Sequence, residues 1–229
     1  GEEEGDLAAS FTLGYQEQPA NIMGLFPKAE LWHALKYFTN DPGMRLINGT
    51  KFLSGLFEGN SPPVRQSHAA FAFLLDYVPN WKRAYGKGGL IQYQPFVPED
   101  TAHDVYSECL KWSQKKGIVP YLGVFKRHVH DPFLMTYSTG GWSMAMDFKV
   151  TAANRKDIWE HTQELTEIVL EGGGRFYFAK DLVIRPEDAR RMFPAANLKK
   201  FLELKRKYDP GSLLQTDMWR RVFEPLADE

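Results

Sequence analysis

The chain of 229 residues is 43% hydrophobic and 14% aromatic, which is enough for one well-buried domain, or one domain with a smaller appendage. Its formal net charge is −1, its basic residues are scattered, and no apolar run approaches the roughly 18–20 residues of a membrane span, so neither nucleic-acid binding nor a transmembrane segment is indicated. The single cysteine, Cys109, excludes an intrachain disulfide framework and favours a reducing, cytoplasmic compartment, with peripheral membrane attachment left open.

The N-terminal part of the chain is predicted to hold one helix and two strands. Residues 1–10 begin with a glycine and three glutamates, and we expect them to be disordered or a remnant of cloning. A helix is predicted to begin at Pro27 and to end where Asn-Asp-Pro-Gly occupies residues 40–43. A short strand is expected at 44–48, followed by a loop rich in glycine and proline and by a buried strand at 69–78.

Residues 89–178 show the clearest pattern, a β-α-β-β-α-β order. Thr101 and Asn154 are predicted to cap the two helices, which end at glycines. This order predicts an α+β, ferredoxin-like fold, in which an antiparallel sheet carries both helices on one face. The strands are expected at residues 90–97, 119–126, 142–150 and 175–178.

The other face of such a sheet must be covered by something else. Because side chains alternate along a strand, Gln92 and Gln94 share one face of their strand, and Leu122, Val124 and Lys126 likewise share a face of theirs. Amides and a lysine are unusual within apolar strands, since an unpaired buried polar group costs about 1–3 kcal/mol. We interpret them as a polar ligand pocket; the alternative is that they lie at strand ends in water.

Other candidate residues carry weaker signals. The small Ser143 and Ala145 could leave room for a ligand or only for a helix. Lys180 beside an aspartate is typical of a solvated ion pair. His128 and His130 have a spacing that can bind metal on a strand, but they lack a third ligand, so no metal site is predicted. The sequence has no G-x-G-x-x-G, Walker or nucleophile-elbow motif.

The last part of the chain has a different character. After Lys180 two short helices are predicted, one opened by Pro186 and one basic helix at about 196–208, with no strand to complete a domain. We therefore predict a substrate-binding domain at 11–176 and a helical arm at 177–229 that packs on another structure.

Five segments in the second half of the chain resemble, in their order and spacing, a known family. They are Leu90-Ile-Gln92-Tyr93-Gln94, Tyr121-Leu-Gly-Val-Phe-Lys126, Gly141-Trp142 with Asp147, Gly173-Gly-Arg-Phe-Tyr177-Phe-Ala-Lys180-Asp181, and Lys205-Arg-Lys-Tyr-Asp209-Pro210 through Asp217-Met-Trp-Arg-Arg221. Together they resemble the C-terminal half of FAD-linked oxidases of the vanillyl-alcohol-oxidase type.

The resemblance implies a division of labour between two domains. In that family an N-terminal domain binds FAD, a ferredoxin-like domain covers the isoalloxazine ring, and the chain returns to the flavin domain at its end. FAD would then be bound mainly by a domain outside these residues, which would be the partner of the arm. The implied activity is oxidation, by hydride transfer, of a CH–OH group of a small-molecule substrate such as a sugar or sugar-lipid.

The resemblance also implies roles for individual residues. Lys180 and Tyr177 would lie near flavin and substrate, with Lys180 stabilising negative charge on the reduced flavin and Tyr177 bonding substrate or relaying a proton. Gln94 and Lys126 would orient substrate hydroxyls. The remaining residues would line the pocket: Gln92, Leu122, Val124, Ser143 and Ala145.

Two departures from the family leave alternatives open. Ser143 and Ala145 stand where a relative has an amide and a cysteine, so the substrate is expected to differ. The pyrophosphate-binding segments are absent, so the chain alone is expected to be inactive and to bind FAD weakly or not at all. The alternative is a stand-alone ligand-binding or scaffold protein that uses the same face; a metal enzyme built on His128 and His130 is a more remote one.

Overall fold

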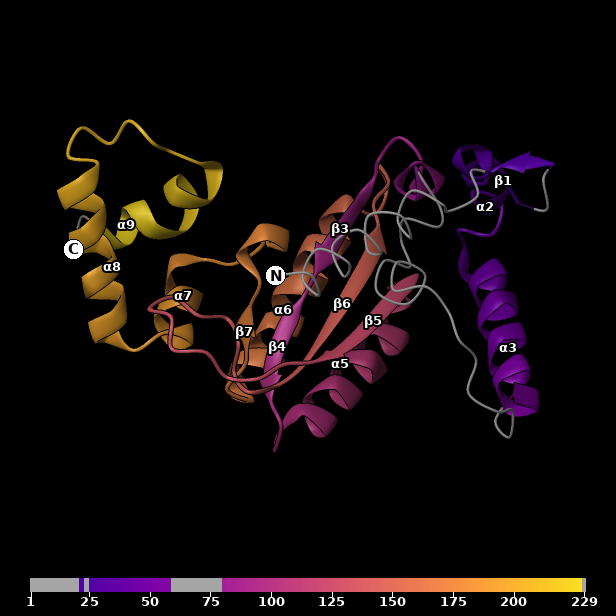
Figure 1. The fold of residues 1–229 in the computed structure, drawn as a ribbon, viewed down its shortest axis with the longest axis horizontal. Coiled ribbons are helices and arrows are strands. Elements are labelled where there is room, and N and C mark those ends of the chain that lie inside the picture. Colours follow the sequence, from indigo (N-terminus) through magenta and orange to yellow (C-terminus); the bar gives the residue numbers. More distant parts are fainter. Residues whose placement is uncertain (1–20, 23–24, 59–79, 228–229) are drawn as a thin grey trace, which may run out of the picture. The chain divides into compact units, whose positions relative to one another are not determined.

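The computed structural model describes residues 21–22, 25–58 and 80–227, and the chain divides into two compact units between Gly89 and Leu90 (Figure 1). Each unit is described by itself. The elements of the first unit are β1 (Asn21–Ile22) paired antiparallel with β2 (Phe26–Pro27), a 3-10 turn η1 (Lys28–Glu30), α2 (Trp32–Leu35), α3 (Asp41–Glu58) and a 3-10 turn η3 (Trp81–Tyr85).

The strand predicted at 44–48 is wrong, because these residues lie inside α3. The predicted helix stop at Pro42 is also wrong, because Pro42 occupies the first turn of α3, where its missing N–H is not needed. Asn40 begins this helix, since its Oδ1 accepts a hydrogen bond from the backbone N–H of Gly43 (3.0 Å). The predicted loop is likewise helical as far as residue 58, and the strand predicted at 69–78 lies outside the described residues.

The second unit has the predicted α+β class and connectivity. Its antiparallel sheet has the order β3-β6-β4-β7, with β5 on the other side of β6. Since β3 and β4 pair with the same strand, the element order is the expected β-α-β-β-α-β. The bounds are β3 (Leu90–Tyr93), β4 (Pro95–Pro98), α5 (Ala102–Lys116), β5 (Leu122–Arg127), β6 (Gly141–Lys149), α6 (Arg155–Glu171) and β7 (Arg175–Phe176).

The first strand is interrupted at Gln94. Tyr93 lies opposite Met146 and Phe96 lies opposite Ser143, so β3 and β4 keep one continuous register along β6. Pro95 has no N–H and cannot donate to the ladder, which explains the break in pairing. Side-chain alternation therefore continues through Gln94, as the sequence predicted.

Helices α5 and α6 cover one face of this sheet (Figure 1). The hydroxyl groups of Tyr93 and Thr166 on α6 share a hydrogen bond of 3.1 Å, and the Tyr106 hydroxyl on α5 donates to the carbonyl of Pro95 at 3.0 Å. The predicted caps are not formed by side chains: the Thr101 hydroxyl donates instead to the Gly172 carbonyl at the end of α6 (2.8 Å). The core of this layer contains Ile91, Val97, Val105, Cys109, Met146, Phe148, Ile158, Leu165, Val169 and Phe176.

The C-terminal arm follows β7. Its elements are a 3-10 turn η4 (Phe178–Lys180), α7 (Pro186–Met192), α8 (Ala195–Tyr208), a π-helical turn η5 (Trp219–Phe223) and α9 (Glu224–Ala227). Apolar arm residues such as Ile184, Met192 and Val222 belong to the same hydrophobic cluster as the sheet and its helices. The arm is thus anchored on this unit, and its packing on a further domain stays a prediction.

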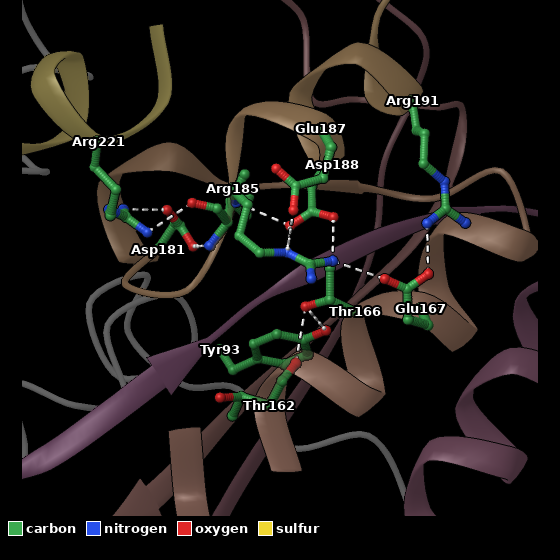
Figure 2. A network of polar contacts seen from close by, with 11 residues as sticks. Tyr93, Thr162, Thr166, Glu167, Asp181, Arg185, Glu187, Asp188, Arg191 and Arg221 are labelled. Atoms are coloured by element: carbon green, nitrogen blue, oxygen red, sulfur yellow. Dashed lines mark hydrogen bonds and ion pairs between the residues drawn. The ribbon is translucent and has the colours of Figure 1, made fainter. Parts of the chain in front are cut away.

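A polar network joins the arm to α6 (Figure 2). The Asp188 carboxylate is completely buried and accepts from the Arg185 side chain at 3.0 and 2.8 Å and from its backbone N–H at 2.8 Å. Glu167 on α6 binds both Arg185 and Arg191. Asp181 accepts from Arg221 at 2.7 Å. The Asp181 carboxylate is therefore buried and held within the arm.

Among the described residues, no helix combines the length and the apolar character that crossing a bilayer would require.

Candidate functional site

Three rows of side chains cross the face of the sheet opposite α5 and α6, which we call the polar face. Strand register defines the rows, because residues paired across neighbouring antiparallel strands point to the same side. All the predicted site residues except Lys180 lie in them. The rows are Gln92, Asp147 and Leu122; Tyr177, Gln94, Ala145 and Val124; and Arg175, Phe96, Ser143 and Lys126.

The two predicted glutamines are held by hydrogen bonds within the polar face. Gln92 Nε2 donates to Asp147 Oδ1 at 3.1 Å, and Asp147 is buried. Gln94 Nε2 donates to Ser143 Oγ at 3.3 Å, and both residues are buried. Pairing of buried polar groups removes most of the desolvation cost, so each amide keeps a fixed orientation. The alternative that these glutamines lie at strand ends in water is excluded for Gln94.

His128 extends the polar face beyond β5. Its Nε2 lies 2.7 Å from Ser143 Oγ, and its ring packs on Phe96 with centroids 4.5 Å apart. Burial and then the nearby positive charge of Lys126 lower its pKa, so the imidazole is neutral at neutral pH. The sequence pattern indicates His128 only as a possible metal ligand and does not predict this position. Extending the alternation of Lys126 by two residues would have placed both side chains on one face.

A cluster of three aromatic side chains, Phe96, Tyr137 and Tyr177, forms one side of the site. Phe96, at the centre, is buried and contacts Tyr137 at 4.8 Å between centroids, and Tyr137 meets Tyr177 edge-on at 4.9 Å. Tyr137 comes from the long connection between β5 and β6, where no sequence pattern singled it out. Such rings offer apolar surface with a hydroxyl at its edge, which suits ligands that are partly polar.

The two predicted lysines are placed differently. Lys126 is exposed and lies opposite Ser143 in the register of β5 and β6. Lys180 is half-buried and is fixed through the backbone: its N–H donates to the Tyr177 carbonyl (2.9 Å), and the Tyr177 N–H donates to the Gln94 carbonyl (3.2 Å). Lys180 thus lies outside the rows but is connected to the middle one.

Arg175 on β7 is hydrogen-bonded to the connection between β5 and β6. Arg175 Nη1 donates to the Thr136 carbonyl at 2.8 Å. The pKa of Asp131 is lowered, and the largest cause is the hydrogen bond that its carboxylate accepts from the Thr136 hydroxyl. Within the described part of the chain, no three His, Cys, Asp or Glu side chains gather as a metal site would need, and the site has instead the amides, hydroxyls and aromatic rings of an organic-ligand site.

The second unit has an α+β fold, and comparison with known proteins confirms the resemblance of the chain to the C-terminal part of FAD-linked oxidases. The chain is 31% identical over 158 residues, 69% of its length, to the decaprenylphosphoryl-beta-D-ribose oxidase of Mycolicibacterium smegmatis, covering 33% of that protein. It is also 29% identical over 141 residues, 61% of its length, to an uncharacterized protein in the mprA 5' region of Streptomyces coelicolor, covering 37% of that protein.

The chain therefore spans about a third of the length of these two curated relatives. No protein-family model matches the chain.

Proposed function

We propose that this chain is the substrate-binding part of an FAD-dependent oxidoreductase that oxidises a CH–OH group of a sugar. The observation that carries the proposal is the polar face, where two oriented glutamines, a serine and two tyrosines surround a buried phenylalanine. The similarity to an oxidase whose name specifies β-D-ribose supports both the redox chemistry and the class of substrate. A cytoplasmic location is part of the proposal.

The residues present fit the ring system of FAD better than its phosphates. A half-buried lysine and a tyrosine, Lys180 and Tyr177, suit an aromatic ring that gains negative charge, whereas Gly172-Gly173-Gly174 ends a helix and cannot act as a phosphate cradle at a helix start. We therefore assign the pyrophosphate and adenosine to an N-terminal domain of the same protein. When bound, FAD supplies the acceptor for a hydride.

The chain's residues would act on the substrate as follows. Gln94 and Lys126 hydrogen-bond the sugar hydroxyls, while Gln92, Leu122 and Val124 line the pocket with the small Ser143 and Ala145. The reacting carbon loses a hydride, its hydroxyl loses a proton through Tyr177 to water, and the C–OH group becomes C=O. The ammonium of Lys180 stabilises the negative charge that develops on the cofactor side.

The test uses the whole protein that carries this chain, under anaerobic conditions with D-ribose as the probe. We expect the sugar to bleach the flavin absorption band. Lys180→Met should slow bleaching by about a hundredfold, the cost of removing one charge-stabilising group. Lys199→Met, which removes an exposed lysine of α8, is the matched control. Equal rates for the two variants would remove Lys180 from the mechanism.

The same experiment separates this proposal from the alternative of a stand-alone binding protein. A whole protein that contains no flavin and still binds the sugar would support the binding protein. For the chain by itself, adding FAD should give no stoichiometric yellow complex; formation of one would show that these residues hold the cofactor unaided.

A further inference from the structure

The hydrogen bonds of Ser143 indicate which partners donate and which accept in the chain from Gln94 to His128. The amide Nε2 of Gln94 can only donate, so the Ser143 oxygen accepts from it at 3.3 Å. The hydroxyl oxygen could accept a second hydrogen bond, but among the described residues the proton of the buried Ser143 hydroxyl finds no acceptor other than Nε2 of His128, 2.7 Å away. We therefore take the serine as the donor to Nε2. A neutral imidazole that accepts at Nε2 carries its proton on Nδ1.

The surroundings keep the ring in this state. Ser143 is completely buried, and Phe96 packs on the imidazole, so the ring has little freedom to turn. From β5 the exposed ammonium of Lys126 disfavours a second positive charge on His128. None of the hydrogen bonds found among the described residues uses Nδ1 of His128, whose side chain is half-buried.

We propose that His128 is a substrate-positioning residue, which presents its Nδ1–H as a hydrogen-bond donor to an oxygen atom of the sugar. This inference rests on the proposed function, because it places His128 in the same site. Gln94, Ser143 and His128 act in sequence: the amide orients the hydroxyl, the hydroxyl fixes the tautomer, and the imidazole meets the ligand. The ligand group it recognises is an acceptor, either a hydroxyl oxygen or the carbonyl oxygen of the product.

Substitutions separate the two nitrogen atoms of the ring. His128→Gln keeps an acceptor near the position of Nε2 but removes the outer donor, whereas His128→Asn keeps a donor near the position of Nδ1. His128→Gln should weaken D-ribose binding about threefold to tenfold, the worth of one neutral hydrogen bond, and His128→Asn should weaken it less. His103→Gln, on the exposed surface of α5, is the matched control and should leave the affinity unchanged.

The tautomer is measured directly by long-range proton–nitrogen NMR spectra of the imidazole rings in the 229-residue chain. We expect the Nδ1–H form for His128 at neutral pH and mixed tautomers in Ser143→Ala. An Nε2–H form or a charged ring in the unsubstituted chain would overturn the inference whatever the sugar does.

Titration with D-ribose then distinguishes the two proposals. A shift of both the Gln94 side-chain amide and His128 Nδ1 is the expected result. A shift of Gln94 without His128 would overturn this inference and leave the proposed function standing. A titration that moves no residue of the polar face would overturn both.

Discussion

Removing the buried carboxylate of Asp188 should strongly destabilise the second unit. Asp188 accepts three hydrogen bonds from Arg185, two of them from the guanidinium, and it is completely buried. Removing one partner of a buried ion pair costs about 3–5 kcal/mol. Because Arg185 is partly exposed and keeps Glu167 as a partner, we expect the lower end, about 3 kcal/mol for Asp188→Ala.

Urea unfolding monitored by tryptophan fluorescence measures this loss as a lower midpoint with an unchanged m-value. The control is Asp217→Ala, which removes a fully exposed carboxylate paired with Arg220 and should leave the midpoint nearly unchanged. If the two substitutions lower the midpoint equally, the network of Figure 2 does not hold the arm on α6.

Three further predictions concern a glycine of the sheet and two histidines, one on α6 and one after β5. Gly141→Ala should cost about 1–3 kcal/mol in urea unfolding, because its Cβ would lie 2.2 Å from the Val97 carbonyl oxygen, whereas Gly123→Ala has open space and should be nearly neutral; similar costs would contradict the close approach. Burial lowers the pKa of His161 in the folded state, so the unfolded chain binds more protons and stability should fall as the pH drops below about 6.5. His161→Gln should flatten the dependence of stability on pH in this range, and an unchanged slope of stability against pH would contradict the prediction. Lys126→Met should raise the pKa of His128 in an NMR titration, because the repelling charge is gone, but burial should still hold it below the ordinary value; no rise would mean that the two side chains do not interact.

Periodicity along the strands predicted most of the second unit. The register that aligns Gln92, Gln94 and Phe96 could be read from alternation alone, because Pro95 removes a hydrogen bond without shifting the strand. The same local reasoning failed in the first unit, where Pro42 is compatible both with a helix stop and with a helix start. The hydrogen bond that Asn40 Oδ1 accepts from the Gly43 N–H shows that a helix starts here, and the geometry of this bond cannot be read from a sequence.

The site was predictable to the extent that its residues belong to strands. Tyr137 lies in a long connection without periodicity, so its contact with Phe96 depends on how the loop folds back. The prediction of a side-chain cap at Thr101 failed for a related reason. The Thr101 hydroxyl bonds the Gly172 carbonyl, a tertiary partner, in place of a backbone N–H of its own helix.

The two backbone hydrogen bonds that connect Gln94, Tyr177 and Lys180 run from the interrupted strand to the turn after the sheet edge. The main chain at the lysine is consequently ordered by this unit before any other molecule arrives. A ligand or second polypeptide that binds the Lys180 amine therefore binds to a backbone that is already ordered. Its association does not have to include the entropic cost of ordering this segment.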